Sequence, residues 1–219
     1  MDLQLFEYLQ TYLTERRKTL FKEMLAQRTR HFTVVTEDVY QLHNTSAVMR
    51  SCDVFGIQDL HVIEERFGKR VDREIAMGAQ KWVDIYRHQK AHDCIKTLKE
   101  KGYQIIATTP HGNATLLHEF DVSKKSAFFF GTEKKGVSDE VMEQANGFLK
   151  IPMYGFTESL NISVSAAIIL QEVVTRMRLE KVAWQLTVEE QLEIEFNWTH
   201  KSIKSVDNIM ERFHNQKNA

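Results

Sequence analysis

The chain has 219 residues, of which 42% are hydrophobic and 27% charged, so it can form one domain with a substantial core. Its formal net charge of −1, two prolines and two cysteines argue against a long basic arm, a disordered linker and a disulfide framework. No stretch approaches the roughly 18 uninterrupted apolar residues of a membrane span. We therefore expect a soluble, cytoplasmic protein with reduced thiols.

The N-terminal segment, residues 3–26, carries apolar side chains at helical spacing, which predicts an amphipathic helix or a pair of helices. Basic residues gather in and just after it, and a second basic group follows in an expected loop. An RNA-contact surface and an ordinary solvated helix face explain these charges equally well. The first group is Arg16, Arg17, Lys18, Lys22, Arg28 and Arg30, and the second is Lys69, Arg70 and Arg73.

The middle of the chain alternates between short apolar strands and helices from residue 31 onward. Asn44 is expected to cap the first of these helices, and Ser159 or Asn161 the last. Because several strands are apolar throughout, the alternation predicts an α/β fold with a mostly parallel sheet covered by helices on both faces. The expected strands are 31–39, 59–64, 82–86, 103–109, 126–131 and 147–153, and the expected helices are 44–55, 91–102, 138–145 and 161–181.

The C-terminal segment resumes helical spacing from Trp184 with balanced charges, which predicts two further helices packing on the domain or on a partner chain. The chain thus divides into three expected parts. They are an N-terminal helical extension that contacts RNA (1–30), an α/β domain (31–181) and a C-terminal helical extension (182–219).

Common nucleotide and metal signatures are missing from the sequence. No G-x-G-x-x-G follows a strand, and "GTEKKGVS" at 131–138 places Val137 where a P-loop requires its lysine. His88 and His92 have i, i+4 spacing, but no third ligand is suggested nearby. We therefore expect no metal site.

Three polar groups remain, each following an expected strand, where open α/β sheets place their sites. Taken singly, each has a structural explanation as a helix cap or a turn. Taken together, "NTSAVMR" with Asn44 and Arg50, "FGTEKKG" with Glu133, and "IPMYGFTESLNISVSAA" with Ser159 and Asn161 form an ordered series. This series resembles the three motifs of the SPOUT methyltransferases, in particular the TrmH branch of RNA ribose 2'-O-methyltransferases, over residues 30–178.

The resemblance implies a fold, a cofactor and an assembly. In that family the C-terminal part of the sheet forms a deep trefoil knot, an α/β-knot, and S-adenosylmethionine binds in the knotted loops. Family members are homodimers in which residues of one chain complete the site of the other. By position, the implied cofactor-binding residues are Thr108, Thr109, Gly131, Ile151, Met153 and Leu160.

The implied reaction is attack of an RNA ribose 2'-hydroxyl on a sulfonium methyl group. Arg50 matches the family's essential arginine, and because a guanidinium stays protonated in proteins, we expect a cationic clamp on the hydroxyl rather than a base. Asn44 would orient Arg50 or the ribose, Glu133 would fix its loop, and Ser159 and Asn161 would hold substrate or cofactor.

The substrate implied by the resemblance is tRNA, because the length and terminal helices resemble enzymes that methylate guanosine 18 in the D-loop. Arg176 and Arg178 on the long helix join the expected RNA contacts. Three alternatives stay open at this point: methylation of 23S rRNA, methylation of the tRNA wobble nucleotide, and a non-enzymatic RNA-binding module.

Overall fold

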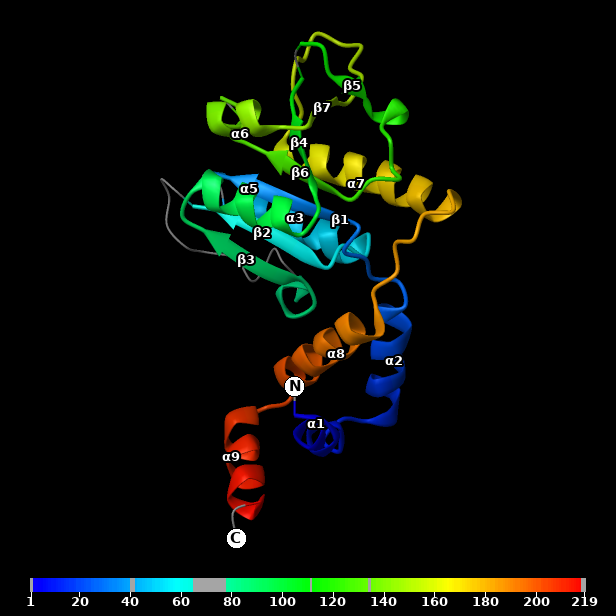
Figure 1. Ribbon diagram of the computed structural model, residues 1–219, viewed down its shortest axis with the longest axis vertical. Coiled ribbons are helices and arrows are strands. Elements are labelled where there is room, and N and C mark those ends of the chain that lie inside the picture. The colour runs from blue at the N-terminus through cyan, green and yellow to red at the C-terminus, as the bar shows by residue number, and fades with distance from the viewer. Residues whose placement is uncertain (1, 40–41, 65–77, 111, 134, 218–219) are drawn as a thin grey trace. The chain divides into compact units, whose positions relative to one another are not determined.

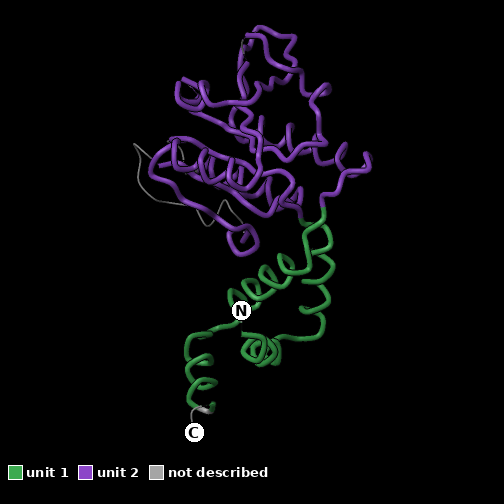
Figure 2. The backbone as a smooth tube through the Cα atoms, viewed as in Figure 1, with its two compact units in different colours: residues 1–28, 185–219 green, residues 29–184 purple. Residues whose placement is uncertain are grey.

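The computed structural model describes residues 2–39, 42–64, 78–110, 112–133 and 135–217 (Figure 1). The chain forms two compact units, one made of residues 1–28 and 185–219 and the other of residues 29–184 (Figure 2). The expected basic group at Lys69, Arg70 and Arg73 lies outside the described residues. In the part of the chain that is described, no helix has the length and apolarity needed to cross a membrane.

A parallel sheet is the centre of the unit formed by residues 29–184. Across the sheet the described strands run in the order β3-β2-β1-β6-β4-β7-β5, and every pair is parallel. This confirms the predicted α/β class, although the short β5 was not predicted. The strands are β1 (Phe32–Glu37), β2 (Asp59–Ile63), β3 (Asp84–His88), β4 (Gln104–Thr108), β5 (Thr115–Leu116), β6 (Ser126–Phe130) and β7 (Gly147–Lys150).

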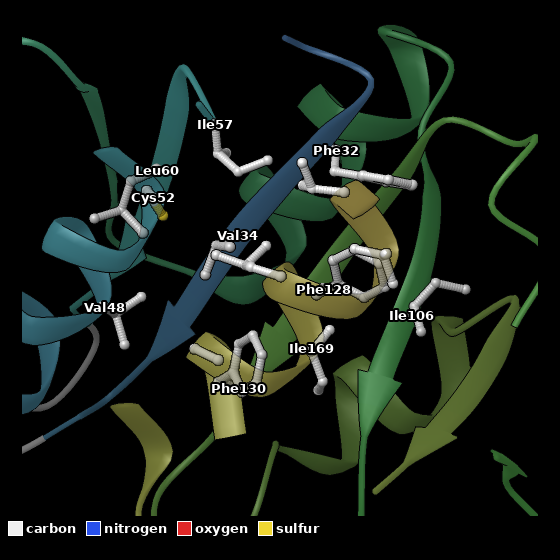
Figure 3. Close-up of a cluster of buried hydrophobic side chains, with 14 of the residues drawn as sticks. Phe32, Val34, Val48, Cys52, Ile57, Leu60, Ile106, Phe128, Phe130 and Ile169 are labelled. Atoms are coloured by element: carbon white, nitrogen blue, oxygen red, sulfur yellow. The ribbon is translucent and has the colours of Figure 1, made fainter. Parts of the chain in front are cut away.

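Helices cover both faces of this sheet, as predicted. Because side chains alternate along a strand, Phe128 and Phe130 of β6 pack with α3 and α7, whereas Phe129 packs with α5 and α6. Figure 3 shows the first of these clusters, with Val48 of α3 and Ile169 of α7 converging on the sheet. The elements are α3 (Leu42–Val54), α5 (Ala91–Glu100), α6 (Asp139–Gln144), α7 (Ile162–Leu179) and the 3₁₀ turns η1 (Ala79–Lys81) and η2 (Leu117–Glu119).

Several element boundaries differ from the expectation by one to three residues, and two of the differences have a clear local cause. The strand expected at 82–86 begins at Asp84, because the preceding residues close η1, where the Val83 amide donates to the Ala79 carbonyl at 3.0 Å. Asn44 does not cap α3, which starts at Leu42, so the predicted N-cap is wrong. Asn161 does cap α7, because its Oδ1 accepts the Ser163 amide at 2.9 Å.

The unit formed by residues 1–28 and 185–219 is helical in its described part. The sequence left open one N-terminal helix or a pair of helices, and the structure has a pair. Apolar side chains of α1, α8 and α9 form its core, which includes Leu5, Leu9 and Val206. The tail helices therefore pack on the N-terminal helices, a pairing that helical spacing cannot specify. The elements are α1 (Leu3–Gln10), α2 (Glu15–Leu25), α8 (Val188–Ser202) and α9 (Val206–Lys217).

Candidate active site

A cavity of about 550 Å³ opens at the C-terminal ends of β4, β6 and β7, which are neighbours in the sheet. This is the edge at which parallel α/β sheets bind ligands, and the volume is within the range of small-molecule sites. The cavity lining includes all six residues that the resemblance assigns to the cofactor. They are Thr108, Thr109, Gly131, Ile151, Met153 and Leu160.

The two threonines are held by the strands beside them. The Thr108 hydroxyl donates to the Phe129 carbonyl of β6 at 2.8 Å, and the Thr109 amide donates to the Leu149 carbonyl of β7 at 3.0 Å. These bonds join β4 to both of its neighbours at the point where the three strands end. The rim of the cavity is therefore fixed by strand pairing.

Residues 131–133, 135 and 136 belong to a tight turn that forms another wall of the cavity. The Thr132 amide donates to the Gly136 carbonyl at 2.9 Å, and the Gly136 amide donates to the Thr132 carbonyl at 2.8 Å. Gly136 has φ +70°, and a Cβ added to Gly131 would lie 2.0 Å from the Gly136 carbonyl carbon and oxygen. Both glycines are required, Gly136 for its left-handed conformation and Gly131 for the close approach of two backbone segments.

Three motifs that are distant in sequence meet at the carboxylate of Glu133. Its Oε1 accepts from the side-chain amides of Asn44 at 3.2 Å and Asn161 at 3.0 Å. The Asn161 amide also donates to Asn44 Oδ1 at 3.0 Å. Asn44 is only 6% exposed, so this bonding satisfies an amide that would otherwise be buried without a partner. The side chain of Asn44 therefore bonds to the loop that carries Glu133 instead of capping α3.

Glu37 supports the segment that carries Val137 and Asp139 of the cavity lining, and the sequence analysis missed it. It ends β1, is 4% exposed, and its Oε2 accepts the Ser138 amide at 2.8 Å. Ser138 in turn caps α6, with its hydroxyl accepting the Val141 amide at 3.4 Å. A carboxylate at the end of an otherwise apolar strand was the signal that could have revealed it.

Arg50 occupies a different position from the other expected catalytic residues. Glu133 and Ser159 line the cavity, and Asn44 and Asn161 bond to Glu133, but Arg50 is not among the lining residues of the described chain. Its side chain on α3 is exposed, and its guanidinium makes no hydrogen bond or ion pair within the described residues. An exposed cation of this kind is available to an anion supplied from outside the chain.

Comparison with known proteins gives consistent results. Residues 31–171 match the SpoU rRNA Methylase family. The chain belongs to this family. A tRNA (guanosine(18)-2'-O)-methyltransferase of Thermus thermophilus is 40% identical over 167 residues, covering 76% of this chain and 86% of the relative. A protein of Borreliella burgdorferi with the same name is 33% identical over 197 residues, covering 90% of each chain.

A solved structure agrees with these relatives. The A. aeolicus TrmH/SpoU tRNA modifying enzyme has a TM-score of 0.79 and 31% identity, covering 87% of this chain and 98% of that one. The resemblance to the TrmH branch inferred from the three motifs is thereby confirmed.

The cavity of this SpoU family member suits S-adenosylmethionine chemically. Ile151, Met153 and Leu160 offer apolar surface for an adenine ring, and the turn at Gly131 brings backbone groups close to the ligand. Hydroxyl and carboxylate groups of the lining can bind a ribose and an ammonium group. These polar lining residues include Thr108, Thr109, Ser159, Glu133, Asp139 and Glu158.

Among the basic residues expected to contact RNA, three on α2 are exposed and two others are not available. Arg16, Arg17 and Lys22 are exposed. Arg28 is 5% exposed, with its guanidinium carbon 5.3 Å from the centre of the Trp198 ring. Arg30 Nε lies 3.2 Å from an Asp59 carboxylate oxygen, and its side chain is 14% exposed. The expectation that Arg28 and Arg30 contact RNA is therefore corrected. Arg28 is buried against Trp198 and Arg30 is paired with Asp59, so both guanidinium groups have structural roles.

The two arginines of α7 that were expected to contact RNA each interact with a neighbouring side chain. Arg176 Nη2 lies 3.2 Å from Glu180 Oε1, and Arg178 stacks with its guanidinium carbon 4.5 Å from the centre of the Trp184 ring. Burial lowers the pKa of Arg178 from its usual value. Both side chains keep some exposure, so a role in RNA contact stays a prediction.

Proposed function

We propose that this protein transfers a methyl group from S-adenosylmethionine to a ribose 2'-hydroxyl of RNA, with guanosine 18 of tRNA as the target. The single observation that carries the proposal is the cavity at the ends of β4, β6 and β7, with Glu133 joining Asn44 and Asn161 beside it. The Thermus and Borreliella relatives bear the name of this activity. The target is inferred from them.

The bound cofactor would supply a methyl group on a positively charged sulfur, which is already activated for transfer. The chain then has to position two reactants and stabilise the charge that develops on the ribose oxygen. Thr108, Gly131 and Leu160 would bind the donor. Arg50 would bind the hydroxyl and the adjacent phosphate as a planar, permanently charged donor. Glu133 would keep the loops in register without contacting the reacting atoms.

A homodimer is part of the proposal. Val164 and Ile168 on α7 are 45% and 37% exposed, an unusual exposure for side chains at the start of a long apolar helix. Arg50 lies outside the cavity lining of its own chain, which favours a site completed by a second copy. Sedimentation of the purified protein as a monomer at micromolar concentration would contradict this part.

The proposal includes a trefoil knot, RNA contact by the terminal helices and a cytoplasmic location for the protein. The trefoil knot is implied by the three motifs, and it would include the segments that follow β6 and β7 and line the cavity. The helices within residues 1–30 would contact RNA through Arg16, Arg17 and Lys22, and those of 182–219 would support them. Cys52 and Cys94 are buried and are not joined by a disulfide, which suits a reducing cytoplasm.

The decisive experiment transfers a tritiated methyl group from S-adenosylmethionine to unmodified tRNA transcripts and maps the product. We expect label at the ribose of guanosine 18, and no label when that guanosine is replaced or carries a 2'-deoxy sugar. Label at the wobble ribose or only on ribosomal RNA would overturn the target. Absence of cofactor binding in calorimetry at millimolar concentration would overturn the enzymatic proposal and favour an RNA-binding module.

A further inference from the structure

Two histidines and a cysteine meet on the sheet face that α5 covers, away from the residues that line the cavity. His61 Nδ1 and His88 Nε2 form a hydrogen bond of 2.9 Å, and the ligand atoms of His61, His88 and Cys94 all lie within 4.8 Å of one another. His61 is 1% exposed and Cys94 is fully buried. None of the three is among the described residues of the cavity lining.

The fold itself brings these groups together. β2 and β3 pair in parallel with Ile63 opposite His88, and His61 lies two residues before Ile63 on the same face. α5 begins at Ala91, three residues after His88, so its first turn places Cys94 over the ends of both strands. Three separate elements thus contribute one ligand atom each.

We infer that His61, His88 and Cys94 form a binding site for a thiophilic transition-metal cation, with Zn²⁺ as the expected occupant. Two imidazole nitrogens and one thiolate are ligands that Zn²⁺ prefers over hard oxygen donors. With metal–ligand distances of about 2.0–2.3 Å, a tetrahedral ion requires nitrogen–nitrogen separations of about 3.3 Å. The imidazole nitrogens, 2.9 Å apart, need to separate by a few tenths of an ångström. The Cys94 sulfur, which lies within 4.8 Å of them, has to come to about 3.6 Å from each.

The surroundings favour the ligating forms of the two imidazoles. Burial, with smaller contributions from His88 and Lys101, lowers the pKa of His61 to about 3, so this ring is neutral at physiological pH. Burial also lowers the pKa of His88, opposed by the charge of Asp93. A neutral imidazole can bind a metal through its unprotonated nitrogen. Because one of the two facing nitrogens carries the proton of their hydrogen bond, metal binding requires that ring to take its other tautomer.

The thiol of Cys94, unlike the two imidazoles, has to lose a proton before it can bind a metal. Burial raises its pKa, and the nearby charge of Glu37 raises it further, so without metal the sulfur carries its proton. Metal binding would release this proton to solvent and form the metal–sulfur bond. Glu37 and Asp93 would then partly balance the charge of the ion, against the opposing charge of Lys101.

An ion at this position would stabilise the edge of the sheet rather than take part in methyl transfer. β3 is the terminal strand of the described sheet order, and the site would tie it to β2 and α5. His92, which has i, i+4 spacing from His88, is not part of the cluster, because its Nδ1 lies 3.3 Å from the Glu140 carboxylate. The partner of His88 comes instead from the neighbouring strand.

The test is a titration of the purified, chelator-treated full chain with Co²⁺, followed by competition with Zn²⁺. We expect a thiolate-to-cobalt charge-transfer band, displacement of Co²⁺ by Zn²⁺, and a rise in Tm on Zn²⁺ addition. Since loss of a supporting contact alone weakens metal binding by about 10–100-fold, Cys94→Ala should weaken Zn²⁺ binding by at least about 100-fold and abolish the band. The matched control is Cys52→Ala, the other buried thiol, which should keep both signals.

Each result decides the proposal. A charge-transfer band in the wild type that is lost in Cys94→Ala and kept in Cys52→Ala supports it. A wild-type protein without the band under a large molar excess of Co²⁺, or a band that survives Cys94→Ala, overturns it. If circular dichroism shows Cys94→Ala to be unfolded, His88→Gln replaces it, with loss of Zn²⁺ binding supporting the site and retention overturning it.

Discussion

Asn161 donates its side-chain amide to Glu133 at 3.0 Å, which joins the start of α7 to the turn after β6. The same amide group of Asn161 reaches Asn44 of α3, so one carboxylate and two amides link three segments of the chain. A network of this kind acts as a unit, because removing one member leaves the others without partners.

Replacing Glu133 tests this network. Glu133→Ala removes the acceptor of two amides, and since hydrogen bonds to charged groups contribute about 1.5–3 kcal/mol, we expect kcat/KM to fall by about 10–100-fold. Glu133→Gln keeps an acceptor oxygen and should lose less. Steady-state methyl transfer to tRNA measures both, and equal activity of the alanine variant and the wild type would contradict the role of the carboxylate.

Arg50 provides the second prediction. Because its exposed guanidinium lies outside the cofactor cavity, Arg50→Ala should bind S-adenosylmethionine almost normally in calorimetry. Turnover should fall by about 10²–10³-fold, the usual effect of removing a donor that stabilises developing negative charge. Arg50→Lys should recover little, because an ammonium group cannot bind two oxygens side by side. Near-normal turnover of the lysine variant would show that a point charge is enough.

Gly131 tests the close approach inside the turn. A Cβ at this position would lie 2.0 Å from backbone atoms of Gly136, so Gly131→Ala must displace the turn that lines the cavity. We expect cofactor affinity to fall by at least about 10-fold, the effect of roughly 1.4 kcal/mol. The control is Gly147→Ala in β7, whose added Cβ would meet Ile106 Cδ1 at an ordinary 3.4 Å. Equal affinity of the two variants would contradict a rigid turn.

Replacing exposed basic residues should weaken tRNA binding, whereas replacing a buried one should lower stability. The double variant Arg16→Ala, Lys22→Ala should raise the KM for tRNA and reduce the salt dependence of binding by about 0.7–0.9 per lost phosphate contact. Arg28→Ala should instead lower Tm, because it removes the guanidinium that stacks on Trp198. Unchanged salt dependence in the double variant would exclude these positions from the RNA surface.

The lowered pKa of His31 leads to a prediction of how the stability of the protein depends on pH. Its Nε2 donates to the Val122 carbonyl at 2.9 Å, and burial, with some effect of Lys125, lowers its pKa below the usual 6.5. Below pH 6.5 the His31 imidazole therefore takes up a proton more readily in the unfolded chain than in the folded one. The free energy of unfolding is unaffected by protonation of His31 above this pH and decreases as the pH falls below it. His31→Gln keeps a donor and does not titrate.

The measurement is urea unfolding at neutral pH and at about pH 5, a window in which histidines titrate but most carboxyl groups do not. We expect the wild type to lose more stability on acidification than His31→Gln. Identical losses would show that the His31 imidazole is protonated in the folded state as easily as in the unfolded one.

The sequence alone determined the class of fold, because that information is local. Apolar runs such as "SAFFF" predicted β6, helical spacing predicted α5 and α7, and Asn161 was correctly identified as a possible cap. The motif series was also sufficient to recognise the family, since three ordered motifs carry far more information than any single one.

The tertiary structure decided which residues meet. Asn44 reads locally as a helix cap and Glu133 as a turn residue, and only the sheet order brings them within 3.2 Å of each other. Likewise the i, i+4 spacing of His88 and His92 indicated no metal site, and the strand register that brings His88 next to His61 is not visible in the sequence. Arg28 and Arg30 looked available for RNA until burial and Asp59 showed their charge to be already in use. Periodicity specifies which face of an element is apolar, but the partners of a polar side chain depend on strand order and chain packing, which no local pattern contains.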